Sequence, residues 1–182
     1  MKDLADPDLL TRAVGGDRAA FDELMRRHED RVLAICLRIM RDRENALDAV
    51  QETFLTVFRK AGQFRGDSLF STWLYRVAVN TCYDQLRRMK RRPSDPLPEG
   101  YEPPDRRVDS ALSAVELRPD LTTALAALSE EFRTTLVLAD VEGLPIGEVA
   151  AILQVAEGTV KSRLHRARKE LARILGNREA WG

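Results

Sequence analysis

The sequence is short of the features that mark secreted, membrane-spanning and metal-binding proteins. Its 182 residues include two cysteines, and aromatic residues make up 6%. Cys36 and Cys82 lie far apart in the chain, without the close spacing of a metal or redox motif, so we expect two buried structural thiols. No apolar run approaches the roughly 18 residues of a membrane span, and the acidic N-terminus MKDLADPDLL lacks the apolar core of a signal peptide. We therefore expect a cytoplasmic protein.

Signatures of enzyme chemistry are also absent from the sequence. It contains no Gly-rich phosphate loop, nucleophile motif or cluster of metal ligands. The two histidines, His28 and His165, are isolated, and the carboxylate pair Asp48 and Glu52 has no histidine beside it. We predict that the protein is no enzyme, with no catalytic residue, no bound metal and no cofactor.

The formal net charge is +0, yet the charge is distributed unevenly along the chain. Lys and Arg outnumber Asp and Glu by five to one in 83–92 and by seven to two in 157–178. Between these two islands, residues 93–120 carry seven acidic residues against three basic ones. A single basic run is typical of a solvated helix face. Two such runs, each at the end of a helical unit, favour a polyanionic partner.

Helical periodicity dominates, which predicts an all-α fold of two small helical domains. The stretch RRPSDPLPEGYEPPDRR holds five of the eight prolines and predicts a flexible acidic linker at 93–118. The linker separates a domain at 1–92 from a domain at 119–182. The first domain is predicted to contain a helix at 21–40, a second helix, and a long helix at 72–91. We expect the second helix to bury the stripe Leu47, Val50, Phe54, Val57 and Ala61.

The long helix at 72–91 has two contrasting faces. Leu74, Ala78 and Cys82 repeat at i+4 and are expected to face the core. The opposite face carries an aromatic ring, an amide, a carboxylate and guanidinium groups: Trp73, Arg76, Asn80, Asp84, Arg87 and Arg91. This mixture suits the edges, phosphates and rings of nucleic acid. The alternative is a solvated face on which Asp84 pairs with Arg87 or Arg88.

The second domain ends in a helix-turn-helix pattern. A short apolar helix, PIGEVAAIL, is followed by the tight turn QVAEG and by the basic helix EGTVKSRLHRARKEL. The inward face of the basic helix is Val160, Leu164, Ala167, Leu171 and Ile174. Its N-terminal turn can enter a DNA major groove, and we predict contacts to bases and phosphates from Glu157, Thr159, Lys161, Ser162 and Arg163. Arg166 is expected to meet the DNA backbone. The alternative is a plain three-helix bundle with a basic surface.

Three stretches in this order resemble the extracytoplasmic-function (ECF) sigma factors, the small two-domain group of bacterial RNA polymerase initiation factors. They are DAVQETFLTVF, FRGDSLFSTWLYRVAVNTCYDQLRR and IGEVAAILQVAEGTVKSRLHRARKEL, and the resemblance covers about residues 8–175. It implies that the first stretch binds the polymerase clamp, the second melts and reads the minus-10 promoter element, and the third reads the minus-35 element. The implied partners are core RNA polymerase, promoter DNA and an anti-sigma factor, without direct membrane insertion.

The resemblance also implies a role for each matching residue. The residues implied to contact polymerase are Asp48, Gln51, Glu52 and Leu55. A loop that captures a flipped minus-10 base contains Phe64, Arg65, Gly66 and Ser68. The other minus-10 contacts fall to Trp73, Asn80, Asp84, Arg87 and Arg88. The minus-35 contacts fall to Thr159, Lys161, Ser162, Arg163 and Arg166, with Glu157 beside them. The sequence departs from the family where Gln154 stands in place of the Gly that often follows the first helix of the helix-turn-helix.

A different function remains compatible with the C-terminal pattern. A helix-turn-helix repressor or response regulator would use 119–176 for DNA and 1–92 for sensing or dimerisation, without binding polymerase. That alternative predicts tight duplex binding by the free protein. It leaves the stretch FRGDSLFSTWLYRVAVNTCYDQLRR without a role.

Overall fold

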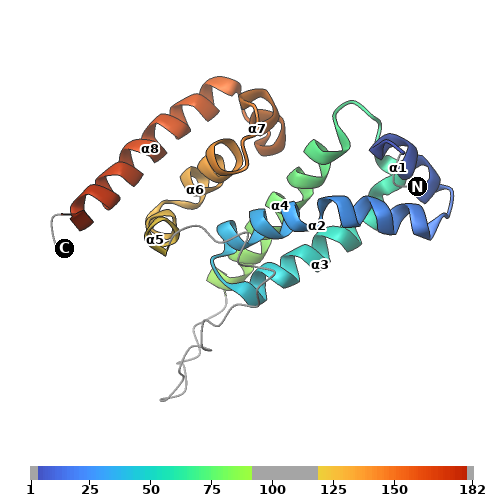
Figure 1. Cartoon of the computed structure of the whole chain (residues 1–182), viewed down its shortest axis with the longest axis horizontal. Helices are drawn as coiled ribbons and strands as arrows, with labels where there is room; N and C mark the ends of the chain where they lie inside the picture. The colour runs from blue at the N-terminus through green and yellow to red at the C-terminus, as the bar shows by residue number, and fades with distance from the viewer. Residues whose placement is uncertain (1–3, 92–118, 180–182) are drawn as a thin grey trace, which may run out of the picture.

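The computed structural model describes residues 4–91 and 119–179, and every regular element in these ranges is helical (Figure 1). The first unit consists of α1 (Asp6–Val14), α2 (Arg18–Met40), α3 (Arg43–Lys60), the short turn η1 (Ala61–Gln63) and α4 (Phe70–Arg91). The second consists of α5 (Pro119–Ala127), α6 (Glu130–Leu136), the π-helical turn η2 (Val137–Val141), α7 (Ile146–Leu153) and α8 (Glu157–Glu179). The predicted all-α fold is confirmed, whereas the linker predicted at 93–118 lies outside the described residues.

Short acidic side chains determine where two helices of the first unit begin. Asp17 Oδ1 accepts a hydrogen bond from the Ala20 N–H at 3.1 Å, which starts α2. Asp42 Oδ1 accepts one from the Asn45 N–H at 2.8 Å, which starts α3. Each such cap contributes about 1 kcal/mol. Helix α1 was not predicted; it begins with Pro7 in its first turn and packs on α2.

The core of the first unit lies between α2, α3 and α4. Leu74, Ala78 and Cys82 of α4 are fully buried, as predicted. The prediction that Leu47 of α3 is buried is wrong, because its side chain is 39% exposed. Small residues form much of the inward face of α3, so neighbouring helices approach this face closely and Leu47 is turned outward. The buried residues of α3 are Ala46, Ala49, Val50, Thr53 and Val57.

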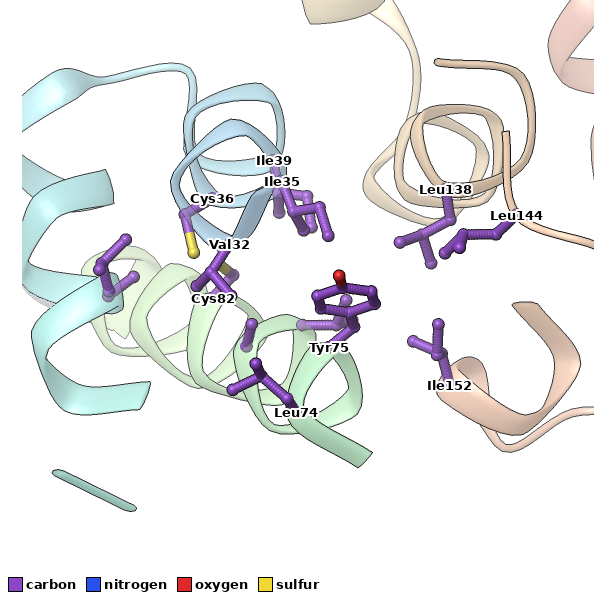
Figure 2. Packing of buried hydrophobic residues seen from close by; sticks show 14 of the residues in the cluster. Val32, Ile35, Cys36, Ile39, Leu74, Tyr75, Cys82, Leu138, Leu144 and Ile152 are labelled. Carbon is purple, nitrogen blue, oxygen red and sulfur yellow. The ribbon is translucent and has the colours of Figure 1, made fainter. Parts of the chain in front are cut away.

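The two cysteines meet in this core although 45 positions separate them in the sequence. Cys36 on α2 and Cys82 on α4 are both free, buried and adjacent (Figure 2). The hydrogen bond to Cys36, together with burial, raises the pKa of the Cys82 thiol. A thiol that stays protonated is a poor nucleophile, so the prediction of buried structural thiols is confirmed.

In the second unit, α8 packs on α5, α6 and α7. Ser129 starts α6, because its Oγ accepts a hydrogen bond from the Phe132 N–H at 3.4 Å. The guanidinium of Arg133 is buried and donates to the carbonyl oxygens of Ala126 and Leu128 at 3.2 and 3.3 Å. These carbonyls end α5 and have no partner within their own helix, so Arg133 closes the C-terminus of α5.

The two units pack against one another, and their apolar residues form one continuous cluster. Helices α2 and α4 of the first unit contact α6, η2 and α7 of the second (Figure 1). Tyr75 of α4 points toward Leu138, Leu144 and Ile152 across this interface (Figure 2). Four buried side chains therefore join segments that lie more than 60 positions apart in the chain.

Candidate nucleic-acid and partner interfaces

The outer face of α3 combines acidic, amide and exposed apolar side chains. Asp48 and Gln51 are exposed, and the Leu55 side chain is 53% exposed. Leu47 and Phe58 extend this apolar stripe along the same helix, and the sequence reasoning did not assign either residue to the surface. Leu47, Leu55 and Phe58 are spaced by eight and three residues, which places the stripe on one side of the helix. Exposed apolar residues in a row with polar neighbours mark a protein-binding surface.

Glu52 of the same predicted set differs from its neighbours because α4 holds its carboxylate. Glu52 Oε2 accepts a hydrogen bond from Gln85 Nε2 at 3.2 Å, and Arg88 lies 3.8 Å from the other oxygen. The side chain is only half-buried, so these contacts orient the carboxylate more than they stabilise the fold. Glu52 thus connects the outer face of α3 with the basic end of α4.

A cluster of aromatic rings lies where the loop after η1 enters α4. Phe64, Phe70 and Trp73 have ring centroids 5.4 to 6.1 Å apart at inclined angles. Phe70 is buried, whereas Phe64 and Trp73 are partly exposed. The buried ring fixes the two others at the surface, where a nucleic-acid base can stack.

These rings form one wall of a small surface hollow of about 170 Å³. Its lining combines the aromatic rings with amide, hydroxyl and charged groups: Gln63, Phe64, Arg65, Asp67, Ser68, Trp73 and Arg76. Gly66 has φ +77°, a left-handed conformation that turns the loop around the hollow. The structure thus brings Phe64, Arg65 and Ser68, which the resemblance placed in one loop, together with Trp73 of α4. The hollow is also lined by Arg76, which the sequence placed on the same outer helix face as Trp73. Gln63 and Asp67 line it as well, and neither was assigned a contact to DNA.

Further along α4, the outward face is polar and solvated. Asn80, Asp84, Arg87 and Arg88 are all exposed. Asp84 and Arg87 approach within 3.7 Å, which is the local pairing that the alternative reading expected. Such exposed pairs contribute little to stability, from about 0 to 1 kcal/mol. Their contact therefore leaves the guanidinium group available to a phosphate at low energetic cost.

The helix-turn-helix is formed by α7 and α8. Val160, Leu164 and Ala167 are buried as predicted. The turn begins at Gln154, whose φ of +55° is left-handed and ends α7. Gln154 thus adopts the left-handed conformation that glycine takes readily, and a side chain in this conformation costs about 1–2 kcal/mol.

The first turns of α8 present the predicted DNA-contacting residues. Lys161 and Ser162 are exposed, Thr159 is half-buried, and Glu157 lies 3.9 Å from Lys161. The Ser162 hydroxyl donates to the Thr159 carbonyl oxygen at 3.2 Å. Arg166 is also exposed.

Arg163 differs from the other predicted contacts. Its guanidinium lies 3.1 Å from the carboxylate of Glu131 on α6, and its side chain is 20% exposed. Five residues later, Arg168 donates two hydrogen bonds to the carboxylate of Asp140 at 2.7 and 2.8 Å, which raises the pKa of Arg168. Acidic residues of the preceding helices therefore orient two arginines of α8, and periodicity gave no signal for either pair.

Within residues 4–91 and 119–179, no group of three or more His, Cys, Asp or Glu side chains is arranged to hold a metal ion. Over the same part of the chain, no helix combines the length and the apolar character needed to cross a membrane.

Comparison with known protein families accounts for both units. The family described as "Sigma-70 region 2" matches residues 24–92, and "Sigma-70, region 4" matches residues 118–171. The chain is 44% identical to the ECF RNA polymerase sigma factor SigM of Mycobacterium tuberculosis. The match covers 94% of this chain and 85% of SigM. The RNA polymerase sigma-H factor of Pseudomonas aeruginosa is 36% identical and covers 93% of both chains.

A solved structure has the same arrangement of helices. The sigma factor RpoE of Bartonella quintana, crystallised in complex with the anti-sigma factor NepR, superposes with a TM-score of 0.71 at 27% identity. The match covers 86% of this chain and 96% of that one.

Proposed function

Because the chain belongs to the ECF family of RNA polymerase sigma factors, we propose that it initiates transcription through three separate surfaces, carried by α3, α4 and α8. It binds core RNA polymerase and directs it to promoters whose minus-35 duplex it reads and whose minus-10 element it melts. The observation that carries this function is the match of residues 24–92 to sigma-70 region 2, together with region 4 at 118–171. A repressor without polymerase binding is not favoured, because it leaves region 2 without a role.

We assign polymerase binding to the outer face of α3. Asp48, Gln51 and Leu55 are exposed there, and Glu52 is oriented by α4. The apolar stripe supplies apolar surface that is buried when the partner binds. The acidic residues beside it complement the charge of a basic partner.

We assign minus-10 recognition to the aromatic hollow and the outer face of α4. A base extruded from the duplex would stack on Phe64 and Trp73, with Arg65, Gly66 and Ser68 forming the loop beside it. Stacking contributes about 1–3 kcal/mol per base, which offsets the few kcal/mol of unstacking. Asn80, Asp84, Arg87 and Arg88 continue the contact along the opened strand.

We assign minus-35 recognition to α8. Glu157, Thr159, Lys161, Ser162 and Arg163 lie in its first two turns, where a recognition helix meets base edges. Arg166, one turn further, is placed for a phosphate contact.

The three roles divide the chain into two functional domains and a linker. Residues 1–92 form the polymerase-binding and minus-10 domain, and residues 119–182 form the minus-35 domain, with the linker at 93–118. The chain performs no chemistry of its own and acts in the cytoplasm, where core polymerase and promoter DNA are found. An anti-sigma factor is a further partner, which the complex of the Bartonella quintana relative supports.

The test separates the three surfaces by the step that each serves. Leu55→Asp should abolish binding to core polymerase. Trp73→Ala should leave polymerase binding intact and remove promoter melting, measured by permanganate reactivity of unpaired thymines. Lys161→Ala should weaken promoter binding before melting. Equal loss at every step for all three variants, with folded proteins, would contradict the assignment of separate surfaces.

A further inference from the structure

A second hollow, of about 460 Å³, is lined by residues from the ends of α2 and α4 and from the start of α6. Arg41 follows α2, Lys90 lies in the last turn of α4, and Arg133 is on α6. These three cations share the hollow with the carboxylates of Glu130 and Glu131. None of the five residues belongs to the polymerase and promoter surfaces assigned above, so their concentration of charge has a separate cause.

Each of the two carboxylates already has a cationic partner. Lys90 Nζ lies 2.6 Å from Glu130 Oε1, and the guanidinium of Arg163 on α8 lies 3.1 Å from Glu131 Oε2. Lys90, Glu130 and Glu131 therefore contribute little net charge to the hollow once these pairs are formed. The charge that remains is that of the two other arginines.

Arg41 and Arg133 approach one another without an anion between them. Both donate a hydrogen bond to the carbonyl oxygen of Ala126, at 2.8 and 3.2 Å, so the two guanidinium groups share one acceptor. Within residues 4–91 and 119–179, neither of them forms an ion pair. Burial lowers the pKa of Arg133, and the positive charge of Arg41 lowers it further. An anion bound beside both groups would relieve this repulsion.

Arg133 also keeps one edge of its guanidinium unused. Its side chain is buried, and Nη1 makes both of its hydrogen bonds, to the carbonyl oxygens of Ala126 and Leu128. In the described part of the chain, Nε and Nη2 have no hydrogen-bond partner. Nε and Nη2 form the edge with which Arg168 binds both oxygens of Asp140. A buried donor without a partner is costly, and this two-donor edge matches two oxygens of a phosphate.

We propose that this hollow binds a small anion that carries a di- or triphosphate group. One phosphate accepts hydrogen bonds from Nε and Nη2 of Arg133, and the next phosphate lies against Arg41. Ser129 adds a donor, because its Oγ accepts a hydrogen bond at the start of α6 while its O–H remains available. The volume suits a ligand larger than a single phosphate, since small-molecule sites occupy about 300–1,000 Å³.

Isothermal titration calorimetry of the full-length protein tests the site directly. The probes are pyrophosphate, ATP and inorganic phosphate, each without divalent cations and at physiological salt. We expect saturable binding of pyrophosphate and ATP at one site, and weaker binding of inorganic phosphate, which engages only one of the two arginines. At a pyrophosphate concentration one hundred times the Kd, Tm should rise by about 5–10 °C.

Two substitutions remove the donors. Arg41→Gln removes one charge at an exposed position and should weaken pyrophosphate binding by about 10- to 100-fold, the effect of a charged hydrogen bond. Arg133→Lys keeps the charge but loses the two-donor edge, and should weaken binding by a similar factor. Because Arg133 is buried, this variant can fail to fold, and Arg41→Gln then decides the outcome alone. Arg12→Gln, at an exposed site on α1, is the control and should leave the Kd unchanged.

Glu130→Gln distinguishes anion binding from a purely structural role. Its contact with Lys90 is largely solvated, so its loss costs little stability. Removing this carboxylate lowers the repulsion of a bound anion and frees Lys90, so pyrophosphate should bind severalfold more tightly. A substitution that only loosened the fold would weaken binding instead.

The outcomes decide the proposal independently of the function in transcription. Equal pyrophosphate affinity of the wild type and of folded Arg41→Gln, or no saturable binding at all, overturns it. An oligonucleotide whose binding depends on Arg41 while pyrophosphate does not bind also overturns it, and assigns the arginines to a nucleic-acid backbone. Tighter binding of ATP than of pyrophosphate supports it and identifies the ligand as a nucleotide.

Discussion

Replacing Gln154 by glycine should stabilise the protein, although glycine usually destabilises helical proteins. Gln154 is exposed and has φ +55° and ψ +43° at the end of α7. A side chain in this left-handed conformation costs about 1–2 kcal/mol, which glycine avoids. Glycine also makes the unfolded chain more flexible, which lowers the free energy of unfolding by about 0.4–1 kcal/mol and offsets part of this gain. The expected net stabilisation is about 1 kcal/mol, or roughly 2–4 °C in Tm for a chain of this size.

Urea unfolding followed by circular dichroism measures this gain, with an unchanged m-value showing that the unfolded state is the same. Arg41→Gly is a matched control. Arg41 has φ +63° at the end of α2, but its side chain also donates a hydrogen bond to the Ala126 carbonyl oxygen. Loss of that bond costs about 1 kcal/mol, so Arg41→Gly should gain little or nothing. A lower urea midpoint for Gln154→Gly than for the wild type would refute the reasoning.

Three further predictions address the core, the response to acid and the partner surface. Leu74→Ala removes a fully buried side chain and should cost about 2–5 kcal/mol in urea unfolding. Hydrogen bonds from Arg26 and Arg27 lower the pKa of Glu23 from 4.5 to about 2. Its stabilising contribution is therefore complete above pH 4.5 and is lost as the pH falls toward 2, and Glu23→Gln should flatten that part of the acid-unfolding curve. Leu55→Asp, on an exposed site, should abolish binding to core polymerase with no change in Tm.

Periodicity predicted the elements whose inward faces repeat regularly. The long helix with Leu74, Ala78 and Cys82 inward, and the basic helix with Val160 and Leu164 inward, both have the predicted faces. These patterns are local, because residues three or four positions apart share one side of a helix. The aromatic hollow was predicted in part from the resemblance, which grouped Phe64, Arg65 and Ser68 before their geometry was known.

The features that sequence reasoning missed depend on small residues or on distant partners. Helix α1 is short, so it contains too few apolar residues for a helical repeat to be recognised in the sequence. Leu47 was placed in the core because an apolar residue in register is expected inward, whereas the alanines of α3 take that place. The hydrogen bond from Arg31 to Glu142 spans 111 positions. No local pattern links such residues, so only the packing of the two units reveals the contact.

Run-off transcription tests the central claim most directly. Purified core bacterial RNA polymerase is incubated with fragments of source-genome DNA, with and without the protein. We predict discrete transcripts that require the protein and that disappear with Asn80→Ala or Lys161→Ala, both at exposed positions. The absence of any protein-dependent transcript, together with no binding to core polymerase, would contradict the account and favour a repressor.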